Sequence, residues 1–556
     1  MGLLKGKFFG LRGTKLNLAI SVTAGLDFLL FGYDQGVTGG LLTLPSFTAT
    51  FPEIDTTKTD GLSQSQIDHK STIQGISVAS YNVGCFAGAI LCIFIGNWLG
   101  RRKTIFLGSA IMVVGAALQA SAFGLAHLIV GRVITGIGNG LNTSTVPTWQ
   151  SECSKSHRRG QLVMIEGALI AGGICISYWI DFGFSFLSTS VAWRFPIAFQ
   201  CFFALVILGF IMELPESPRW LVLRGREREA TEVLAALSDL PEEDKFIQSE
   251  FATIKDTVLE MEKSSFKDLF TMDENRNFHR VVLAYVNQMF QQISGINLIT
   301  YYAPFIYEQE IGLSGFLSRI LAACNGTEYF IASLLAIFII EKVGRRKLML
   351  IGAAGMSGSM AILAGMSYLG GSGPGIVAAV FLFVFNSFFA IGWLGMTWLY
   401  PTEVVPLRIR APANALATSA NWAFNFMVVM ITPVAFSSIG YQTYIIFAVI
   451  NAAIVPCVYF FFPETAYRSL EEMDSIFRKT KSIFSLVKTA KNEPHHYGKN
   501  GELLIAHDQM SQRSTATSMT RTDGEGGSWR ANRGYDGDQE KGTKDFVNSS
   551  GDGSPA

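Results

Sequence analysis

The chain has 556 residues, of which 49% are hydrophobic and only 16% are charged, whereas soluble proteins contain about 25% charged residues. Together with a mean hydropathy of +0.32, this composition predicts a membrane protein. Basic and acidic residues balance at 44 each, which excludes the positive surface of a nucleic-acid binder. The seven cysteines have no metal-ligand spacing and no nucleophile–base pair is evident, so we expect no metal, no cofactor and no enzymatic activity.

Twelve apolar stretches are each long enough to cross a bilayer as a helix, which takes ~20 residues. They predict an all-α membrane protein with helices at 16–40, 74–97, 104–122, 125–147, 161–182, 193–213, 280–303, 318–340, 347–368, 375–399, 412–436 and 441–462.

A polar stretch near 222–277 separates the first six of these helices from the last six, and its charge and periodicity predict short helices in water. After the last span an amphipathic pattern follows, and the final residues are too polar and glycine-rich to bury a core. We therefore divide the chain into an N-terminal segment (1–15), two six-helix halves (16–213 and 280–462), linker helices (214–279), an amphipathic helix (463–490) and a disordered tail (491–556).

Lysine and arginine lie in the N-terminus and in every second loop, as in Arg101-Arg102-Lys103, while the loops between them contain almost none. Such an imbalance marks the cytoplasmic side of a membrane protein. We therefore expect both termini and the long middle segment to lie in the cytoplasm.

Three short motifs occur once in each half, in the same order and at nearly the same spacing. Gly-Arg-Arg-Lys occurs at 100–103 and 344–347, a Glu seven residues before an Arg begins at 152 and at 403, and Pro-Glu-Ser or Pro-Glu-Thr occurs at 215–217 and 463–465. The halves are therefore predicted to be structural repeats, as in many transporters. Basic loops alone would signal only topology, but the glutamates favour a network that gates the cytoplasmic side, formed by Arg102, Glu152, Arg159, Glu216, Glu341, Arg345, Glu403, Arg410 and Glu464.

Few charged residues lie at membrane depth, where a charge is costly and therefore indicates a function. Asp27 and Asp34 share one face of the first span, and Arg132 is the only central cation. An Asp–Arg pair there could exchange a proton for an ion pair, or it could be a static salt bridge, and the residues leave both interpretations open. In span five we expect Glu166 to make a closed helix contact, with a position facing the cavity as the alternative.

Neutral amides and aromatic rings are concentrated in spans seven, ten and eleven. Amides both donate and accept hydrogen bonds, which suits the hydroxyl groups of a polyol, and a tryptophan ring can lie flat against an apolar sugar face. Hydrogen bonding between helices explains single residues of this kind but not their concentration. We therefore predict a site for a polar, uncharged solute at Gln291, Gln292, Asn297, Tyr301, Trp393, Trp398, Asn421 and Trp422.

Longer motifs combine these residues: Leu29-Leu-Phe-Gly-Tyr-Asp34, Gly100-Arg-Arg, Gly131-Arg132, Pro215-Glu-Ser-Pro-Arg219, Gln291-Gln292 with Gly-Ile-Asn297 and Tyr301-Tyr302-Ala-Pro304, Glu341-Lys-Val-Gly-Arg-Arg346 and Pro463-Glu-Thr465. With these motifs the chain resembles, from residue 15 to residue 480, the sugar porter family of the major facilitator superfamily. Two further stretches, 33–36 and 179–183, are similar to the fungal sugar/proton symporters of that family.

The resemblance implies a twelve-helix transporter whose two halves rock about a central sugar site. It implies that Asp34 takes up the transported proton with Arg132 as its partner, although some facilitators of the family retain such an aspartate. It also implies an extracellular gate at Tyr301 and sugar contacts by Gln291, Gln292, Asn297, Trp398, Asn421 and Trp422.

Three positions depart from the family's pattern. Gly167, beside Glu166, stands where relatives have a sugar-contacting glutamine, and Asn97 stands where an acidic residue is usual. Tyr329 stands where an asparagine is expected, with Asn325 one turn away. These departures leave the preferred sugar open, and they keep a polyol as an alternative substrate because Gly167 removes one amide and enlarges the pocket.

We therefore predict a multi-pass, monomeric plasma-membrane transporter that imports a neutral hexose or pentose with a proton, its partners being the sugar, the proton and the bilayer. One alternative is a carrier of the same fold that moves a sugar or polyol by facilitated diffusion, and another is a sugar sensor that signals through its tail. Adding sugar to a weakly buffered medium distinguishes them, because only the symporter makes the medium alkaline and a sensor moves no sugar.

Overall fold

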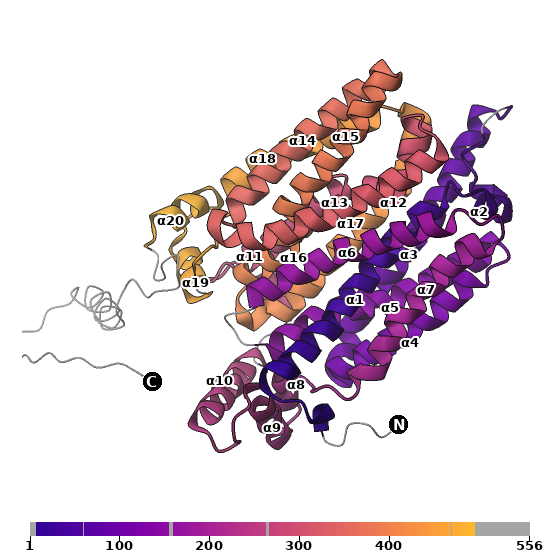
Figure 1. Cartoon of the computed structure of the whole chain (residues 1–556). Coiled ribbons are helices and arrows are strands. Elements are labelled where there is room, and N and C mark those ends of the chain that lie inside the picture. Colours follow the sequence, from indigo (N-terminus) through magenta and orange to yellow (C-terminus); the bar gives the residue numbers. More distant parts are fainter. Residues whose placement is uncertain (1–6, 59–60, 155–158, 263–265, 469, 495–556) are drawn as a thin grey trace, which may run out of the picture. The chain divides into compact units, whose positions relative to one another are not determined.

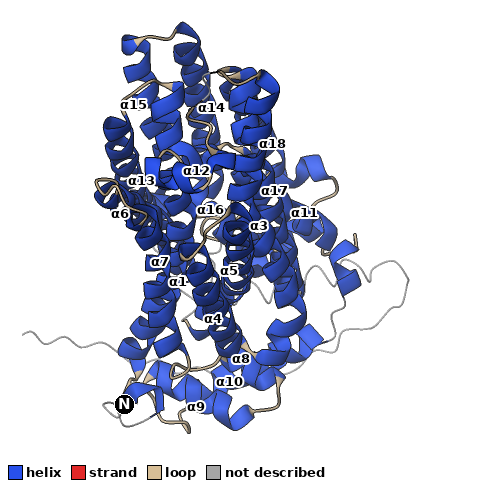
Figure 2. Cartoon of the chain, turned by 90° about the vertical axis from the view of Figure 1, so that its right-hand side faces the viewer, coloured by secondary structure: helices blue, strands red, loops and turns tan. Residues whose placement is uncertain are grey.

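The computed structural model describes residues 7–58, 61–154, 159–262, 266–468 and 470–494. Within these ranges every regular element is a helix and no strand occurs (Figure 2). The predicted disordered tail lies, from residue 495 onward, outside the described residues.

Six long helices form the N-terminal half and follow the predicted spans closely (Figure 1). The second of them begins at Gln64, well before the apolar stretch at 74, because Ser63 and Gln66 form a capping box there. The Ser63 side chain accepts a hydrogen bond from the Gln66 backbone N–H, and the Ser63 backbone N–H donates to the Gln66 side chain at 2.9 Å. The helices are α1 (Gly13–Leu41), α3 (Gln64–Leu99), α4 (Arg101–Ala120), α5 (Leu125–Cys153), α6 (Arg159–Phe184) and α7 (Val191–Ile211), with the short α2 (Pro45–Thr50) in the loop after α1.

The C-terminal half repeats this plan, but two of its predicted spans are interrupted. The span at 280–303 breaks at Ser294 and Gly295, and the span at 375–399 contains a π-helical turn at Ala390–Leu394. The helices are α11 (Asn277–Ile293), α12 (Ile296–Phe305), α13 (Gly315–Val343), α14 (Arg345–Leu369), α15 (Ser372–Phe389), α16 (Met396–Val404), α17 (Arg410–Ile439) and α18 (Gln442–Phe461).

Ten of the described helical segments are long and apolar enough to cross a membrane. The glycines, amides and Arg132 of α5 lower its mean hydropathy, so α5 is not among the ten. The break between α11 and α12 makes each of these two helices too short to be counted. With α5 and the α11–α12 pair counted as spans, the layout has the twelve predicted transmembrane helices.

Glycines set the distance between neighbouring helices in the N-terminal half. A Cβ atom on Gly136 of α5 would lie 2.2 Å from the carbonyl oxygen of Tyr81 in α3, and one on Gly140 would lie 2.1 Å from that of Cys85. Small residues at such contacts let two helix backbones approach closely within a bilayer. The glycine-rich sequence of α5 therefore holds it against α3 and positions Arg132 between helices.

The two Gly-Arg-Arg motifs lie at one end of the helices, which we call the basic end. The linker helices α8 (Pro218–Leu223), α9 (Glu227–Ser238) and α10 (Lys245–Glu262) lie there beside the start of α1 (Figure 1). The amide of Asn17 donates to the carbonyl oxygen of Leu237, and Lys7 forms an ion pair with Glu232 at 2.8 Å. Two further helices, α19 (Leu470–Lys479) and α20 (Leu486–Asn492), follow the last span.

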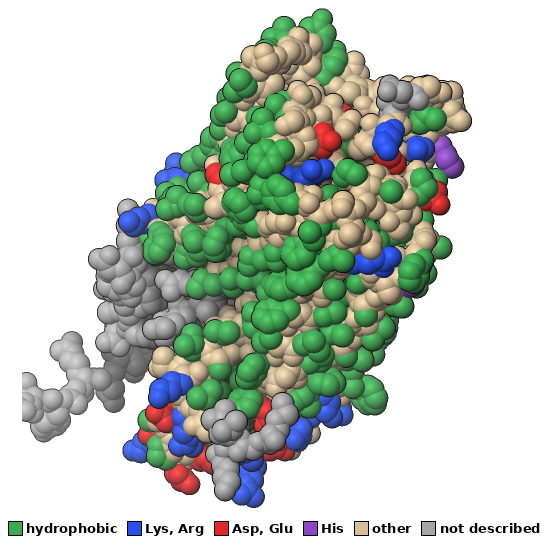
Figure 3. All heavy atoms as spheres, turned by 45° about the vertical axis from the view of Figure 1, so that its right-hand side comes forward, with side chains coloured by type: hydrophobic (Ala, Val, Ile, Leu, Met, Phe, Trp, Pro, Cys, Tyr) green, Lys and Arg blue, Asp and Glu red, His purple; other side chains and the backbone are tan. Residues whose placement is uncertain are grey.

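Apolar side chains cover the flank of the molecule, and charged ones gather at the linker helices (Figure 3). Large hydrophobic residues such as Phe94 and Phe338 are 73% and 71% exposed. Soluble proteins rarely expose contiguous apolar surface of this extent. The exposed belt is therefore the surface that faces lipid.

At the end opposite the basic end, the two halves are in direct contact. A Cβ on Gly39 of α1 would lie 2.6 Å from the carbonyl oxygen of Tyr301 in α12, and one on Gly75 of α3 would lie 2.3 Å from that of Met430 in α17. Arg319 also donates across the halves to the carbonyl oxygen of Thr43, at 2.9 Å. This end is therefore closed by backbone contacts.

Candidate functional site

A small cavity of about 30 Å³ lies between the two halves, and most of the predicted sugar-binding residues line it. This is room for about one or two water molecules, so a larger solute requires the lining side chains to move. The lining consists of Phe31, Gln35, Ile170, Ile174, Gln291, Gln292, Ile296, Asn297, Thr300, Tyr329, Phe389, Leu394, Trp398 and Asn421. None of these described lining residues is ionisable at neutral pH.

The break between α11 and α12 brings the amides together. Gly295 has φ +99°, a left-handed conformation that favours glycine, and the hydroxyl of Ser294 donates to the carbonyl oxygen of Gln291 at 2.6 Å. The chain turns there, so that Asn297 donates back to Gln292 at 2.5 Å. Interrupted helices at mid-membrane are a common way to build a transporter's binding site.

The amides form a continuous hydrogen-bonded row. Gln292 donates to Gln291 at 2.9 Å, and Asn421 of α17 donates to Gln291 at 3.1 Å and to Gln288 at 2.7 Å. The row thus offers neutral donors and acceptors on one wall of the cavity, and these can exchange partners with hydroxyl groups of a solute. It offers nothing to neutralise a charged solute.

Three predicted substrate residues do not line this cavity. Trp393 is fully buried and donates to the carbonyl oxygen of Met349, at 3.2 Å, within the C-terminal half. Tyr301 donates to Asn82 of α3 at 3.3 Å, where the two halves meet. The ring of Trp422 packs on Phe31, with ring centroids 5.3 Å apart, and thus stands behind a lining residue.

Other lining residues are absent from the sequence-based prediction. Gln35 directly follows Asp34, so its place in the sequence was a signal. Gln288 does not line the cavity, but it extends the row of amides through Asn421 and lies one helical turn before Gln292. Phe31 lies one turn before Gln35 on the same face of α1. Apolar or single polar residues of this kind are assigned to a cavity only once the facing helices are known.

Gly167 does not line the cavity either. A Cβ on Gly167 would lie 3.3 Å from the Cα of Gly395, so the glycine allows α6 to approach the start of α16 closely. The idea that Gly167 enlarges the sugar pocket is therefore wrong.

Asp34 and Arg132 are both buried, and Tyr81 contacts both of them. The Tyr81 hydroxyl donates to Asp34 at 3.4 Å, and the Arg132 guanidinium lies 5.6 Å from the centre of the Tyr81 ring. Arg132 donates to the hydroxyl of Thr38 at 2.5 Å and to the carbonyl oxygen of Val78 at 2.8 Å. Among the described residues, the ion pairs within 4.0 Å do not include Asp34 with Arg132, so a static salt bridge does not hold this state together.

The basic end carries the same polar network in each half. In the first half Arg101 pairs with Glu152 at 3.0 Å, and the backbone N–H groups of Arg101 and Arg102 donate to Glu216 at 3.0 and 3.2 Å. Burial raises the pKa of Glu216, more than hydrogen bonds from the backbone of Ser217 and Arg102 lower it. A carboxylate at the start of α4 also stabilises the helix dipole.

In the second half Arg345 pairs with Glu403 at 2.9 Å, and the backbone N–H groups of Arg345 and Arg346 donate to Glu464 at 2.8 and 3.1 Å. Arg410 donates to the carbonyl oxygen of Val405 at 3.1 Å. Each of these contacts lies within one half rather than between halves. The side chains of Arg159 and Glu341, also predicted for this network, lie outside the described residues.

The comparison of the two halves reveals a residue that the sequence-based prediction omitted. Arg101 occupies the position that Arg345 occupies in the second half, and each pairs with the glutamate of its own half. Arg102, which was predicted, donates instead to the carbonyl oxygens of Met212 and Leu214 and lies 4.0 Å from Glu216. The repeat itself was the signal that could have identified Arg101.

Known proteins share this sequence and fold. The family model described as "Sugar (and other) transporter" matches residues 19–477. Sugar transporter STL1 of Saccharomyces cerevisiae is 42% identical over 487 residues, which cover 85% of this chain and 84% of that protein. A quinate permease of Neurospora africana is 31% identical over 489 residues, covering 84% and 89%, and the high glucose sensor RGT2 of S. cerevisiae is 30% identical, covering 84% and 62%.

Solved structures agree. The proton:xylose symporter XylE, bound to 6-bromo-6-deoxy-D-glucose, superimposes with a TM-score of 0.71 at 25% identity and covers 84% of this chain and all of that one. The inward-open xylose transporter XylE from E. coli gives 0.67 at 26% identity, covering 83% and 99%. The predicted fold class and the resemblance are thereby confirmed, and the relatives are transporters rather than enzymes. This chain belongs to the sugar transporter family of the major facilitator superfamily and is a multi-pass membrane transporter.

Proposed function

We propose that the protein imports a neutral monosaccharide, a hexose or a pentose, together with one proton across the plasma membrane. The observation that carries this proposal is the uncharged row of amides along the central cavity, with a buried carboxylate, Asp34, on a neighbouring helix. Hydroxyl groups can replace the amide–amide hydrogen bonds, whereas a charged solute would remain uncompensated. The names of the relatives STL1 and XylE, a sugar transporter and a proton:xylose symporter, support the same substrate class.

In the proposed orientation the basic end is cytoplasmic and both termini lie inside the cell. The contacts of Gly39 and Gly75 then close the external side. The six-helix halves at 16–213 and 280–462, joined by 214–279, rock as a monomer around the sugar, with Tyr301 and Asn82 in the external contact between them. In this scheme 1–15 and 463–490 are cytoplasmic.

The proton site consists of Asp34 and Arg132, which approach and separate during the cycle. Arg132 favours ionised Asp34 when it is near, whereas burial alone favours the protonated acid, so a modest movement changes the proton occupancy. Tyr81 contacts both residues and is positioned to transmit that movement. The networks at the basic end keep each half rigid while the halves move.

Replacement of Gln292 by alanine tests the amide row. The substitution removes hydrogen bonds to sugar hydroxyls and interrupts the row between Gln291 and Asn297. We expect a loss of ~1–3 kcal/mol in binding, which corresponds to roughly a tenfold or larger rise in KM for uptake, with normal amounts of protein at the membrane. Replacing the exposed Gln248 of the linker helix α10 by alanine should leave KM unchanged. An unchanged KM for both variants would remove Gln292 from the site.

Two rivals are tested by one uptake experiment in a host that lacks its own sugar carriers. Labelled hexoses, pentoses and linear polyols are supplied in weakly buffered medium, with and without a protonophore. We expect a monosaccharide to enter, to make the medium alkaline and to lose its accumulation with the protonophore. Transport without alkalinisation would indicate facilitated diffusion, and preference for a polyol would change the substrate class. Specific binding without flux would favour a sensor, and the sensor RGT2 is a relative.

A further inference from the structure

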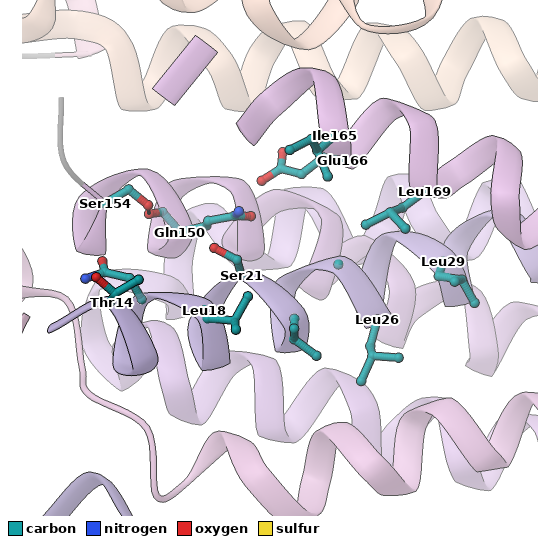
Figure 4. Close-up of a pocket in the computed structure, with 13 residues that line it drawn as sticks. Thr14, Leu18, Ser21, Leu26, Leu29, Gln150, Ser154, Ile165, Glu166 and Leu169 are labelled. Atoms are coloured by element: carbon teal, nitrogen blue, oxygen red, sulfur yellow. Dashed lines mark hydrogen bonds between the residues drawn. The ribbon is translucent and has the colours of Figure 1, made fainter. Parts of the chain in front are cut away.

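A second cavity, larger than the central one, lies in the N-terminal half. Its space of about 740 Å³ lies between α1, α5 and α6 near the basic end, where these helices begin or end (Figure 4). Its apolar wall includes leucines of α1 and α6, and its polar wall includes Thr14, Asn17 and Ser21 of α1, Gln150 of α5, Ser154 directly after α5, and Glu166 of α6. Figure 4 shows Glu166 projecting from α6 toward the side of Ser21 and Gln150.

Glu166 is a buried carboxylate that lines this cavity. Its side chain is 2% exposed, and among the described residues its Oε2 atom has no hydrogen-bond partner. Among the described lining residues there is no cation, and the ionisable neighbour that acts on Glu166 is the carboxylate of Asp27. Glu166 thus lines this cavity and not the central one, which was the alternative to a closed helix contact that the sequence offered. A carboxylate kept here without a cation exchanges protons rather than carrying a fixed charge.

Asp27 lies on α1 beside this cavity, between the lining residues Leu26 and Leu29. Toward Asp34 the backbones of α1 and α6 touch, because a Cβ on Gly32 would lie 1.9 Å from the carbonyl oxygen of Ile170. Toward the basic end the contact is with a side chain, since a Cβ on Gly25 would lie 2.7 Å from the Leu169 Cδ1 atom. Asp27 accepts a hydrogen bond from Asn142 of α5 at 2.7 Å, and its second oxygen has no partner among the described residues. Asp27 therefore lies beside the cavity, on the side of the basic end from the backbone contact at Gly32.

The two aspartates of α1 share one face, two helical turns apart, which is about 10 Å along the axis. Asp34 is contacted by Tyr81 of α3 and acted on by Arg132 of α5, whereas Asp27 accepts a hydrogen bond from the neutral amide of Asn142 and acts through its charge on both Asp34 and Glu166. From Asp34 toward the cavity the chain thus offers the carboxylates of Asp27 and Glu166. A proton that leaves Asp34 finds acceptors in the direction of the basic end.

We propose that Glu166 releases the transported proton to the cytoplasm and that Asp27 relays this proton from Asp34 to Glu166. This inference rests on the proposed proton symport. Asp34 gives up its proton and becomes a carboxylate, Asp27 accepts that proton through bridging water and passes it to Glu166, and Glu166 loses it to water in the 740 Å³ cavity. Asp27 and Glu166 return to their starting states, so that one proton crosses for each sugar.

The test separates net proton-coupled uptake from sugar exchange. Wild-type protein and the variants Glu166→Gln, Asp27→Asn and Glu328→Gln are studied in right-side-out vesicles whose lumen pH is varied. Glu328 of α13 is the matched control, because it is also a membrane-depth glutamate but it accepts a hydrogen bond from Ser387, away from this path. Exchange of labelled for unlabelled sugar requires no net release of protons, whereas accumulation does.

We expect Glu166→Gln to slow proton-driven accumulation by about tenfold or more, the contribution of a positioned proton-transfer group, while exchange stays within about twofold of wild type. Acidifying the lumen should slow accumulation by wild type and by Glu328→Gln, but it should have little further effect on Glu166→Gln. Asp27→Asn should behave like Glu166→Gln.

Three results would overturn the inference. If Glu166→Gln accumulates sugar at the wild-type rate with the same dependence on lumen pH, the proton leaves by another route and the proposed symport stands. If Glu166→Gln loses exchange as severely as accumulation, Glu166 is a packing residue. If wild-type protein exchanges sugar but never concentrates it, the symport proposal itself fails, and the release path fails with it.

Discussion

Replacing Asp34 by asparagine is expected to abolish uphill accumulation of the sugar while leaving its binding and its exchange across the membrane intact. Asparagine resembles the protonated carboxyl group in shape, but it can neither take up nor release a proton. Asp34 is 3% exposed and accepts a hydrogen bond from Tyr81, so the side chain is held in place whether or not it carries charge. A membrane potential of ~100 mV supplies about 2.3 kcal/mol per charge moved, enough for roughly fiftyfold accumulation by the unmodified protein.

Steady-state accumulation of a non-metabolised sugar analogue measures this effect, and Asp68→Asn at the start of α3 serves as the control for an aspartate outside the apolar core. An Asp34→Asn protein that still concentrates the analogue in a protonophore-sensitive way would move the coupling site to Asp27 or Glu166. An unmodified protein that never concentrates the analogue would indicate facilitated diffusion instead.

Replacing Glu403 by alanine is expected to destabilise the folded protein by about 3–5 kcal/mol, because it removes the carboxylate paired with a buried arginine. The Arg345 side chain is only 6% exposed and lies 2.9 Å from Glu403, which also accepts a hydrogen bond from Thr465 at 2.5 Å. A loss of this size is a large share of the ~5–15 kcal/mol that holds most proteins folded. Thermal unfolding of the purified protein in detergent, with the amount at the membrane as a second readout, measures it.

The matched control is Glu229→Ala in the linker helices. Glu229 pairs with Arg226 at 2.5 Å, but both side chains are about half exposed, at 49% and 48%. Exposed pairs of this kind contribute only about 0–1 kcal/mol. Equal thermal stability of the two variants would mean that the pairs at the basic end do not hold each half together, and the rigid-half mechanism would lose its support.

The sequence was most informative about the helices and about the family. Apolar length and charge are local properties, so the spans could be placed without knowing how they pack, and even the polar α5 was recognised between its loops. The breaks were missed, because Ser294-Gly295 and Ala390–Leu394 continue the apolar pattern on both sides. These interruptions depend on contacts with facing helices, and they are what folds Asn297 back onto Gln292.

The sequence by itself determined the transmembrane layout, the internal repeat and the neutral amides of the central cavity, because these follow from periodicity, composition and motif. Only the tertiary structure decided which of two neighbouring or equivalent residues takes each role. Arg101 rather than Arg102 pairs with Glu152, and Trp398 rather than Trp393 lines the cavity. Successive side chains on a helix point in different directions, so the helix register and the facing helix select between them. For the same reason Glu166, which the sequence favoured as a packed helix contact, lines the 740 Å³ cavity between α1, α5 and α6.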